Sequence, residues 1–245
     1  MRFRLIGCEV LYRELCDAVA RAPHEIDIEF VSKGLHDLGA AAMREELQRR
    51  IDRPDAPDCS AVLLGYALCG NGLHGLVARS IPLVAPRAHD CIALLMGSRQ
   101  RYAEYFPAHP GVYFRSTGWL ERGAALEQLA QVRTGAGCEL DDLIRKYGED
   151  NGRYLFGEFT RYRKAYSRLA FIETGLEPDR RFEDRARQEA HEQGWAFEKL
   201  QGSLKLFHGL VAGDWNDEDF LVVAPGWRIA ARYDDAVIRA ERDSE

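Results

Sequence analysis

The sequence predicts an α/β protein with a mostly parallel sheet and flanking helices. Short apolar runs of strand length alternate with segments in which apolar residues recur at helical spacing. Strands that alternate with helices in this way are typical of βαβ units, whose neighbouring strands are parallel. The run AVLLGY (61–66) is apolar throughout, which favours an interior strand covered on both faces.

The expected elements follow this alternation along the chain. The expected strands cover residues 2–7, 26–31, 61–66, 82–86, 111–115, 168–176, 195–201 and 220–227. The expected helices cover residues 9–21, 38–51, 179–193 and 203–212, with a further helix that begins after Asp90 as its N-cap. Two prolines in DRPDAPDC (52–59) indicate a loop between the second helix and the third strand.

The pattern divides the chain into three segments. We expect a first α/β lobe over residues 1–119, a helical insertion over 120–166, and a second α/β lobe over 167–245. RLAFIETGL (168–176) is similar to RLIGCEVL (4–11), which suggests two related Rossmann-like lobes. The alternative is that any two βαβ units look alike at this level, and the sequence leaves both open.

Composition excludes several functional classes. The chain has 245 residues, a formal net charge of −6 and a pI of about 5.7, which argues against a nucleic-acid partner because phosphate binding needs a basic surface. No apolar run approaches the ~18 residues of a membrane span. MRFRLIG is too short and too charged for a secretory signal. Six cysteines without disulfide-framework spacing fit a reducing compartment, so we expect a cytoplasmic protein.

Three cysteines stand where strands are expected to end. They are Cys8, Cys69 and Cys91. Because the carboxyl ends of parallel strands share one edge, where ligands of open α/β sheets bind, the three thiols should converge there. We therefore expect a metal site, for zinc in the first instance or otherwise for another transition metal, with His89 as a fourth ligand or a neighbour.

The surroundings of the three cysteines strengthen this expectation. Cys8 and Cys91 each precede an expected helix, whose free N–H groups favour a thiolate. Cys69 lies in the glycine-rich turn CGNG, where backbone can approach a ligand closely. Three thiolates with one open position are typical of catalytic rather than structural metal sites. The alternative is that these cysteines are small buried hydrophobic residues. Cys16, Cys59 and Cys138 lack this context, and we interpret them as structural.

Other residues near the strand ends are candidates for substrate binding. They are Tyr66, Asn71, Arg87 and Trp119. Arg87 has the alternative role of bonding to backbone carbonyls, and Trp119 that of simple packing. The string GNGLHG (70–75) fits a dinucleotide fingerprint, but only six residues separate Gly75 from Pro82, too few for the crossover helix of that motif.

Strings spread over most of the chain resemble one family. LLGYALCGNGL, PRAHDCIALLMGSRQRY, YFRSTGWLE, RLAFIETGL, GWAFEKLQGSLKLFHGLVAGDW and FLVVAPG are similar to the domain of unknown function 1638. The resemblance implies no assigned activity and therefore no catalytic residues. It implies an association with corrinoid-dependent one-carbon metabolism, and with it a possible corrinoid cofactor or corrinoid-protein partner.

These observations lead to a functional hypothesis with two alternatives. We expect a metal-binding protein with a three-cysteine site that acts in thiol- or corrinoid-linked methyl transfer, because enzymes that methylate thiols hold zinc through Cys and His. Whether the protein is such a methyltransferase-type enzyme stays open. The first alternative is a non-enzymatic carrier of a metal or corrinoid, and the second is a thiol-redox protein. The absence of a C-x-x-C motif counts against the second.

Overall fold

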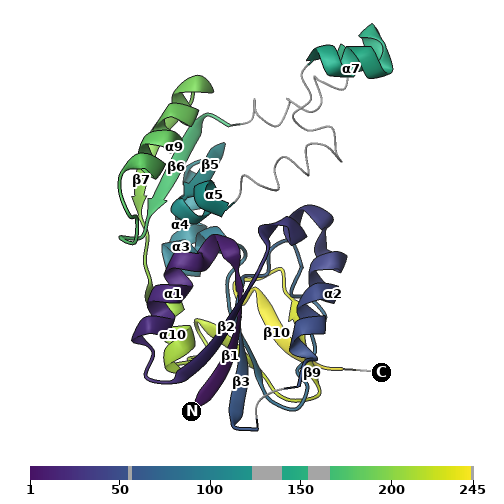
Figure 1. Cartoon of the computed structure of the whole chain (residues 1–245), viewed down its shortest axis with the longest axis vertical. Coiled ribbons are helices and arrows are strands. Elements are labelled where there is room, and N and C mark those ends of the chain that lie inside the picture. The colour runs from purple at the N-terminus through teal and green to yellow at the C-terminus, as the bar shows by residue number, and fades with distance from the viewer. Residues whose placement is uncertain (55–56, 123–139, 154–165, 244–245) are drawn as a thin grey trace. The chain divides into compact units, whose positions relative to one another are not determined.

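The computed structural model describes residues 1–54, 57–122, 140–153 and 166–243 (Figure 1). It confirms the expected α/β fold. The chain forms two compact units, and each is discontinuous in sequence. The first unit contains residues 1–105, 174–176 and 201–245, and the second contains residues 106–173 and 177–200.

The first unit holds most of the strands. Its elements are β1 (Arg2–Cys8), η1 (Glu9–Leu11), α1 (Tyr12–Arg21), β2 (Glu25–Val31), η2 (Lys33–Leu38), α2 (Ala40–Ile51), β3 (Cys59–Gly65), β4 (Leu83–Pro86), α3 (Cys91–Met96), most of α4 (Arg99–Ala108), α10 (Lys205–Ala212), β8 (Phe220–Val223), β9 (Trp227–Ala231) and β10 (Ile238–Arg242). These bounds agree with the expected strands and helices of residues 2–96 within a few residues.

Five of these strands form one sheet in the order β2-β1-β3-β4-β8. The first four strands are parallel, and β8 pairs antiparallel with β4. The chain moves from β1 to β2 on one side and returns to β3 on the other, so the strand order reverses between β1 and β3. In open α/β sheets, ligands bind beyond the carboxyl ends of the strands at such a reversal.

Two glycines at this reversal bring a helix close to the sheet. Gly7 of β1 and Gly65 of β3 are register partners. A Cβ on Gly7 would lie 2.5 Å from Leu15 Cδ1, and one on Gly65 would lie 2.8 Å from the same atom. Leu15 of α1 is fully buried. The glycines therefore let Leu15 pack directly over the last residues of both strands.

Helices cover both faces of the five-stranded sheet. In Figure 1, α1 and α10 lie on one face, and α2 lies on the other. The sheet interior is almost wholly apolar, since the last five residues of β3 and all of β4 are buried. This burial on both faces is what a parallel sheet between two helical layers requires.

The second unit is built on a three-stranded sheet. Its elements are β5 (Val112–Ser116), α5 (Thr117–Arg122), α7 (Leu140–Tyr147), β6 (Arg168–Glu173), α9 (Arg181–Glu192) and β7 (Ala196–Gln201), with the strands in the order β5-β6-β7. β5 and β6 are parallel. The core joins Phe171 of β6 to Phe182 and Ala186 of α9. Arg115 donates to both carboxylate oxygens of Glu189, at 3.0 and 2.8 Å.

The division into units differs from the expected three segments. The expected boundaries at residues 119 and 166 cut through the second unit, because β5 pairs with β6 there. The C-terminal strands return to the first unit, where β8 pairs with β4. Much of the expected helical insertion, 123–139 and 154–165, lies outside the described residues.

The expected strand 220–227 is two strands. β8 ends at Val223, and β9 begins at Trp227 after a turn in which the Trp227 N–H donates to the Ala224 carbonyl oxygen at 3.0 Å. Pro225 and Gly226, the latter with φ of +78°, make this turn. β9 and β10 then pair as an antiparallel two-stranded sheet.

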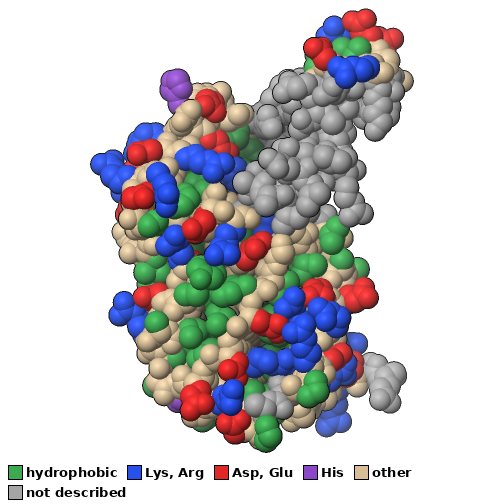
Figure 2. Space-filling model, viewed as in Figure 1, with side chains coloured by type: hydrophobic (Ala, Val, Ile, Leu, Met, Phe, Trp, Pro, Cys, Tyr) green, Lys and Arg blue, Asp and Glu red, His purple; other side chains and the backbone are tan. Residues whose placement is uncertain are grey.

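Charges of both signs mix over the surface seen in Figure 2. Over α2, for example, Arg50 bonds to Glu29 at 2.6 Å and to Glu46 at 2.8 Å. Arg53 and Arg49 join the same network. In the described ranges, no helix has both the length and the apolar character needed to cross a membrane.

The close packing of Leu15 gives a test of the fold. Gly65→Ala should lower the free energy of unfolding by about 1–3 kcal/mol, because the new methyl group overpacks the contact with Leu15. Urea unfolding would measure this. In a Leu15→Ala background the same substitution should cost clearly less, since the methyl group then enters vacated space. Equal costs in both backgrounds would contradict this account of the contact.

Candidate functional site

Cys8 and Tyr66 lie side by side at the carboxyl edge of the sheet. Cys8 is the last residue of β1, and Tyr66 follows Gly65, the last residue of β3. Gly7 and Gly65 are register partners. The residues that follow them, Cys8 and Tyr66, therefore lie next to each other at the strand-order reversal. Cys8 is 2% exposed and Tyr66 is 1% exposed, so both side chains are buried there.

Backbone hydrogen bonds bring Cys69 beside the segment that leads to Cys91. The Leu68 N–H donates to the Ala88 carbonyl oxygen at 2.9 Å, and the Cys69 N–H donates to the His89 carbonyl oxygen at 2.9 Å. Cys91 is buried as the first residue of α3. The segments after β3 and β4 therefore continue the pairing of their strands beyond the sheet.

Cys69 sits in a turn that only a few residue types tolerate. Its φ is +47° and that of Asn71 is +72°, both in the left-handed region. Such angles are uncommon for residues other than glycine and cluster at functional sites. The turn is held at its far end, where the Gly75 N–H donates to the Ile229 carbonyl oxygen at 2.7 Å. The side chain of Asn71 is exposed at the tip.

The three thiols are close enough to influence one another's ionisation. Burial raises the pKa of Cys8 to about 11, and the nearby Glu9 carboxylate adds to this effect. Burial of its sulfur also raises the pKa of Cys69 well above its ordinary value, and the Cys91 and Cys8 thiols contribute to the rise. At neutral pH the metal-free site therefore holds Cys8 and Cys69 as protonated thiols.

Tyr66 forms part of the same cluster. Burial, and the neighbouring Cys8 and Cys69, raise the pKa of its phenol. The hydroxyl lies beside the Cys8 sulfur, yet no described group gives it a hydrogen bond of good geometry. A buried hydroxyl without such a bond is costly, and at a site it indicates a position for a ligand or water.

Sequence reasoning missed His36, which lies against Cys8. The distance from Cys8 Sγ to His36 Nε2 is 3.8 Å. The imidazole also stacks on the Tyr66 ring, with centroids 6.4 Å apart and an interplanar angle of 19°. His36 belongs to η2, a short 3-10 helix after β2 at the same edge of the sheet. Its position after a strand end was the available signal.

Lys33 was also missed. It is 5% exposed, and its positive charge lowers the pKa of Cys8 slightly against the dominant effect of burial. A buried lysine beside thiols favours their ionised form and balances part of the charge that forms there.

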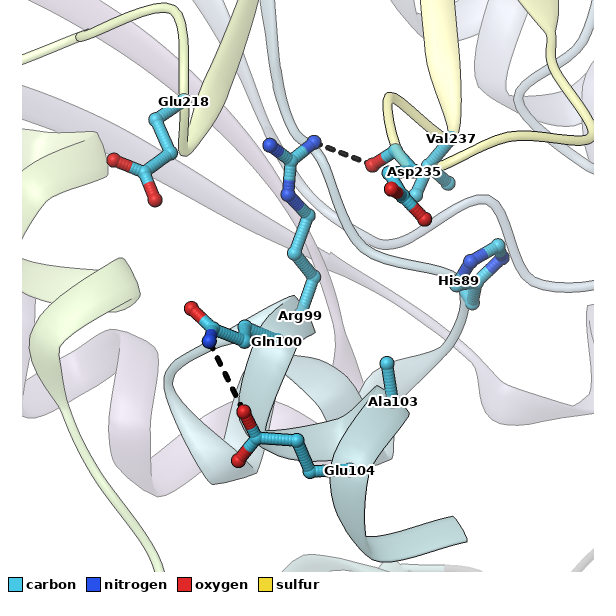
Figure 3. A pocket seen from close by; sticks show the side chains of 8 residues that line it. All are labelled: His89, Arg99, Gln100, Ala103, Glu104, Glu218, Asp235 and Val237. Carbon is cyan, nitrogen blue, oxygen red and sulfur yellow. Dashed lines mark hydrogen bonds between the residues drawn. The ribbon is translucent and has the colours of Figure 1, made fainter. Parts of the chain in front are cut away.

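His89 faces a different feature, a pocket of about 440 Å³ (Figure 3). Its lining comprises His89, Arg99, Gln100, Ala103, Glu104, Glu218, Asp235 and Val237. Arg99 Nη1 donates to the Asp235 backbone oxygen at 2.5 Å. None of the three cysteines is among these residues. The lining of this pocket is therefore distinct from the three cysteines.

Asp90 caps α3, which confirms the sequence prediction. Its Oδ1 accepts from the Ala93 N–H at 3.0 Å, and its Oδ2 accepts from the Tyr102 hydroxyl at 2.9 Å. The Tyr102 ring in turn lies 6.5 Å from that of His89, measured between centroids. Asp90 thereby fixes the start of the helix that carries Cys91.

Arg87 is bound to backbone carbonyls. Its guanidinium donates to the carbonyl oxygens of Phe220 and Ala236, each at 3.1 Å, and to that of Ile238. Burial and the nearby Arg99 lower the pKa of this guanidinium. These contacts favour the role of Arg87 in bonding to backbone carbonyls, by which it holds the C-terminal strands in place. A role in substrate binding stays a prediction.

The remaining candidates lie elsewhere. Trp119 belongs to α5 of the second unit, where its N–H donates to Ser116 Oγ at 3.4 Å. Cys16 and Cys59 are partly exposed and form no disulfide, and Cys138 lies outside the described residues.

The arrangement of the thiols is not a ready-made metal cage. Among the described residues, no three or more His, Cys, Asp and Glu side chains are placed so that they could hold a metal ion. Cys8, Cys69 and Cys91 are neighbours whose sulfurs would have to draw together around an ion. Cys69 lies in a turn that is exposed at Gly70 and Asn71.

Comparison with known proteins gives one match. A family model described as "Protein of unknown function (DUF1638)" matches residues 30–211, well over half of the chain. No curated protein and no solved structure matches the chain.

The contacts of Arg87 predict a structural penalty. Arg87→Ala should lower the free energy of unfolding by at least about 2 kcal/mol, because it leaves backbone carbonyls without their charged donor. Urea unfolding followed by circular dichroism measures this. Arg79→Ala is the matched control, since Arg79 forms an exposed pair with Asp52 and should change stability by less than about 1 kcal/mol. Similar small losses in both variants would contradict the anchoring role.

The raised pKa of Cys8 predicts a stability loss at high pH. The folded protein keeps a proton on this thiol that the unfolded chain releases above a pKa of about 8.5. The stabilisation is therefore complete below about pH 8.5 and is lost as the pH approaches about 11. Each tenfold shift in a proton equilibrium corresponds to about 1.4 kcal/mol, so the loss should reach about 3 kcal/mol.

Urea unfolding of metal-free protein at several pH values between 8 and 11 tests this. Cys8→Ala should flatten the decline, whereas Cys16→Ala, the control, should leave it unchanged. An equally steep decline in Cys8→Ala would show that other groups cause it.

Proposed function

The chain belongs to the family of proteins of unknown function DUF1638, and from its thiol cluster we propose that it binds a transition-metal ion, zinc in the first instance, through Cys8, Cys69 and Cys91. The observation that carries this proposal is that Cys8, at the end of β1, and Cys91, at the start of α3, are both close enough to Cys69 to influence its ionisation.

The electrostatics of the cluster favour a cation. Ionised Cys91 and Cys8 would each disfavour a negative charge on Cys69, so the cluster resists losing several protons unaided. A divalent cation removes this repulsion and keeps the thiols ionised at neutral pH. Zinc suits the donors, because thiolate and imidazole are its common ligands in proteins.

Metal binding requires a local adjustment that the turn permits. The described side chains do not form a complete cage, so the thiols must approach one another when the ion binds. Cys8 and Cys91 are fixed at the end of β1 and the start of α3. Cys69 lies in the turn, and a change there moves its sulfur without disturbing the sheet.

The finer proposal is that the metal site serves thiol- or corrinoid-linked methyl transfer. A metal-held thiolate is a nucleophile at neutral pH and is a suitable acceptor for a methyl group. The buried Tyr66 hydroxyl would then orient the reacting group. A carrier of a metal or corrinoid would need the same ligands, and the two functions separate by turnover with a methyl donor, which only the enzyme shows.

A thiol-redox protein is the remaining alternative. Cys8, Cys69 and Cys91 form no disulfide in the structure, and oxidation of Cys69 with either neighbour would join the two as a disulfide. Counting free thiols before and after mild oxidation distinguishes this function from metal binding. A redox pair loses two thiols reversibly and needs no metal.

Metal analysis tests the proposal directly. Protein purified without oxygen and supplied with zinc should retain about one ion per chain after desalting. Cys8→Ser, Cys69→Ser and Cys91→Ser should each lose it, because a hydroxyl is a poor zinc ligand. Cys16→Ser, which changes a partly exposed thiol of α1 outside the proposed ligand set, should keep it. Equal zinc in wild type and in all three site variants would end the proposal.

A further inference from the structure

We propose that His36, and not His89, is the nitrogen ligand of the thiol site. This inference rests on the proposed metal-binding function and names a ligand that the sequence pattern did not suggest. It makes Cys8 and His36 a preformed pair of ligands, which Cys91 and, after the local adjustment of its turn, Cys69 complete.

The spacing of the two side chains carries the inference. In a tetrahedral zinc site with bonds of ~2.3 Å to sulfur and ~2.0–2.1 Å to nitrogen, the two ligand atoms lie about 3.6 Å apart. Cys8 Sγ and His36 Nε2 are 3.8 Å apart. The pair therefore already has the separation that zinc imposes on two of its ligands.

The imidazole is also held in orientation. Its ring stacks on Tyr66, with centroids 6.4 Å apart and an interplanar angle of 19°. Tyr66 itself is buried and lies beside Cys8 and Cys69. A metal ligand held in place by packing loses little freedom when the ion binds, which strengthens binding.

A separate set of contacts positions the helix that carries His36. Glu9 Oε1 accepts from the Lys33 N–H at 2.7 Å and from the Ser32 hydroxyl at 2.9 Å. Ser32 Oγ in turn accepts from the Gly34 N–H at 3.3 Å, which caps η2. Since Glu9 follows Cys8 directly, the chain ties the first turn of η2 to the residue next to the thiol.

His89 has different surroundings. Its side chain is exposed, lines the pocket of Figure 3 and lies near Tyr102. It is the backbone oxygen of His89 that contacts the cysteine segment, through the Cys69 N–H. The proximity of His89 to Cys91 in sequence thus positions the backbone and not the imidazole.

Two histidine variants form a matched pair of tests. Zinc affinity is measured by competition with a chromophoric chelator, and coordination by the visible spectrum after cobalt(II) substitution. His36→Ala should weaken zinc binding by at least about tenfold and lower the intensity of the tetrahedral cobalt bands, because a direct ligand is lost. His89→Ala should leave both unchanged. His36→Cys should restore binding, since it supplies a sulfur.

Thermal unfolding of each metal-free variant shows whether the fold is kept. If His36→Ala does not fold, His36→Gln keeps the size of the side chain and should show the same loss of zinc. Wild-type zinc affinity in His36→Ala or in His36→Gln overturns the inference, as does a loss confined to His89→Ala. A wild-type protein that binds no zinc overturns the proposed function as well, so the two failures are distinguishable.

Discussion

The contact of Leu15 with the paired glycines Gly7 and Gly65 is the constraint on which the candidate site depends. It lets α1 lie close against β1 and β3 at the position where the strand order reverses. The next residues along these strands are Cys8 and Tyr66. The packing of Leu15 on the two glycines therefore also fixes the positions of these two site residues. Any side chain at either glycine would separate the helix from the strands and would displace the thiol with them.

Burial gives the site a chemistry that differs from that of an exposed thiol cluster. The protonated thiols of Cys8 and Cys69 are poor nucleophiles, and the same burial that raises their pKa strengthens any electrostatic interaction formed there. Lys33 supplies one positive charge nearby, which is less than three thiolates would require. Burial thus holds Cys8 and Cys69 in their protonated, less reactive form at neutral pH.

Regular elements were predictable because their signals are local. The apolar run of β3 and the N-cap Asp90 agree with the structure. The division between β8 and β9 was missed because Pro225 and Gly226 stand inside an apolar run that reads as one strand. The arrangement of units could not be predicted, since the pairing of β8 with β4 depends on residues more than a hundred positions apart.

The histidine beside Cys8 illustrates the same limit. His89 is near Cys91 in sequence, and this proximity was the only sequence signal for choosing a histidine beside the thiols. His36 approaches Cys8 through the pairing of β1 with β2 and a short 3-10 helix without hydrophobic periodicity. Arg87 likewise has carbonyl partners 133 to 151 positions away. Their roles follow from tertiary contacts that local patterns do not encode.

The discontinuity of the first unit has a consequence for biosynthesis. The sheet of the first unit lacks β8 and the carbonyl partners of Arg87 until residues 220–238 have been made. All the strands of the second unit are present earlier, once residue 201 has been added. On the ribosome, therefore, the inserted unit has its full complement of strands first. During that interval β4 stands as an open edge, and such an edge is prone to pair with other chains. The pairing of β8 with β4 then completes a sheet whose first strands were made at the start of synthesis.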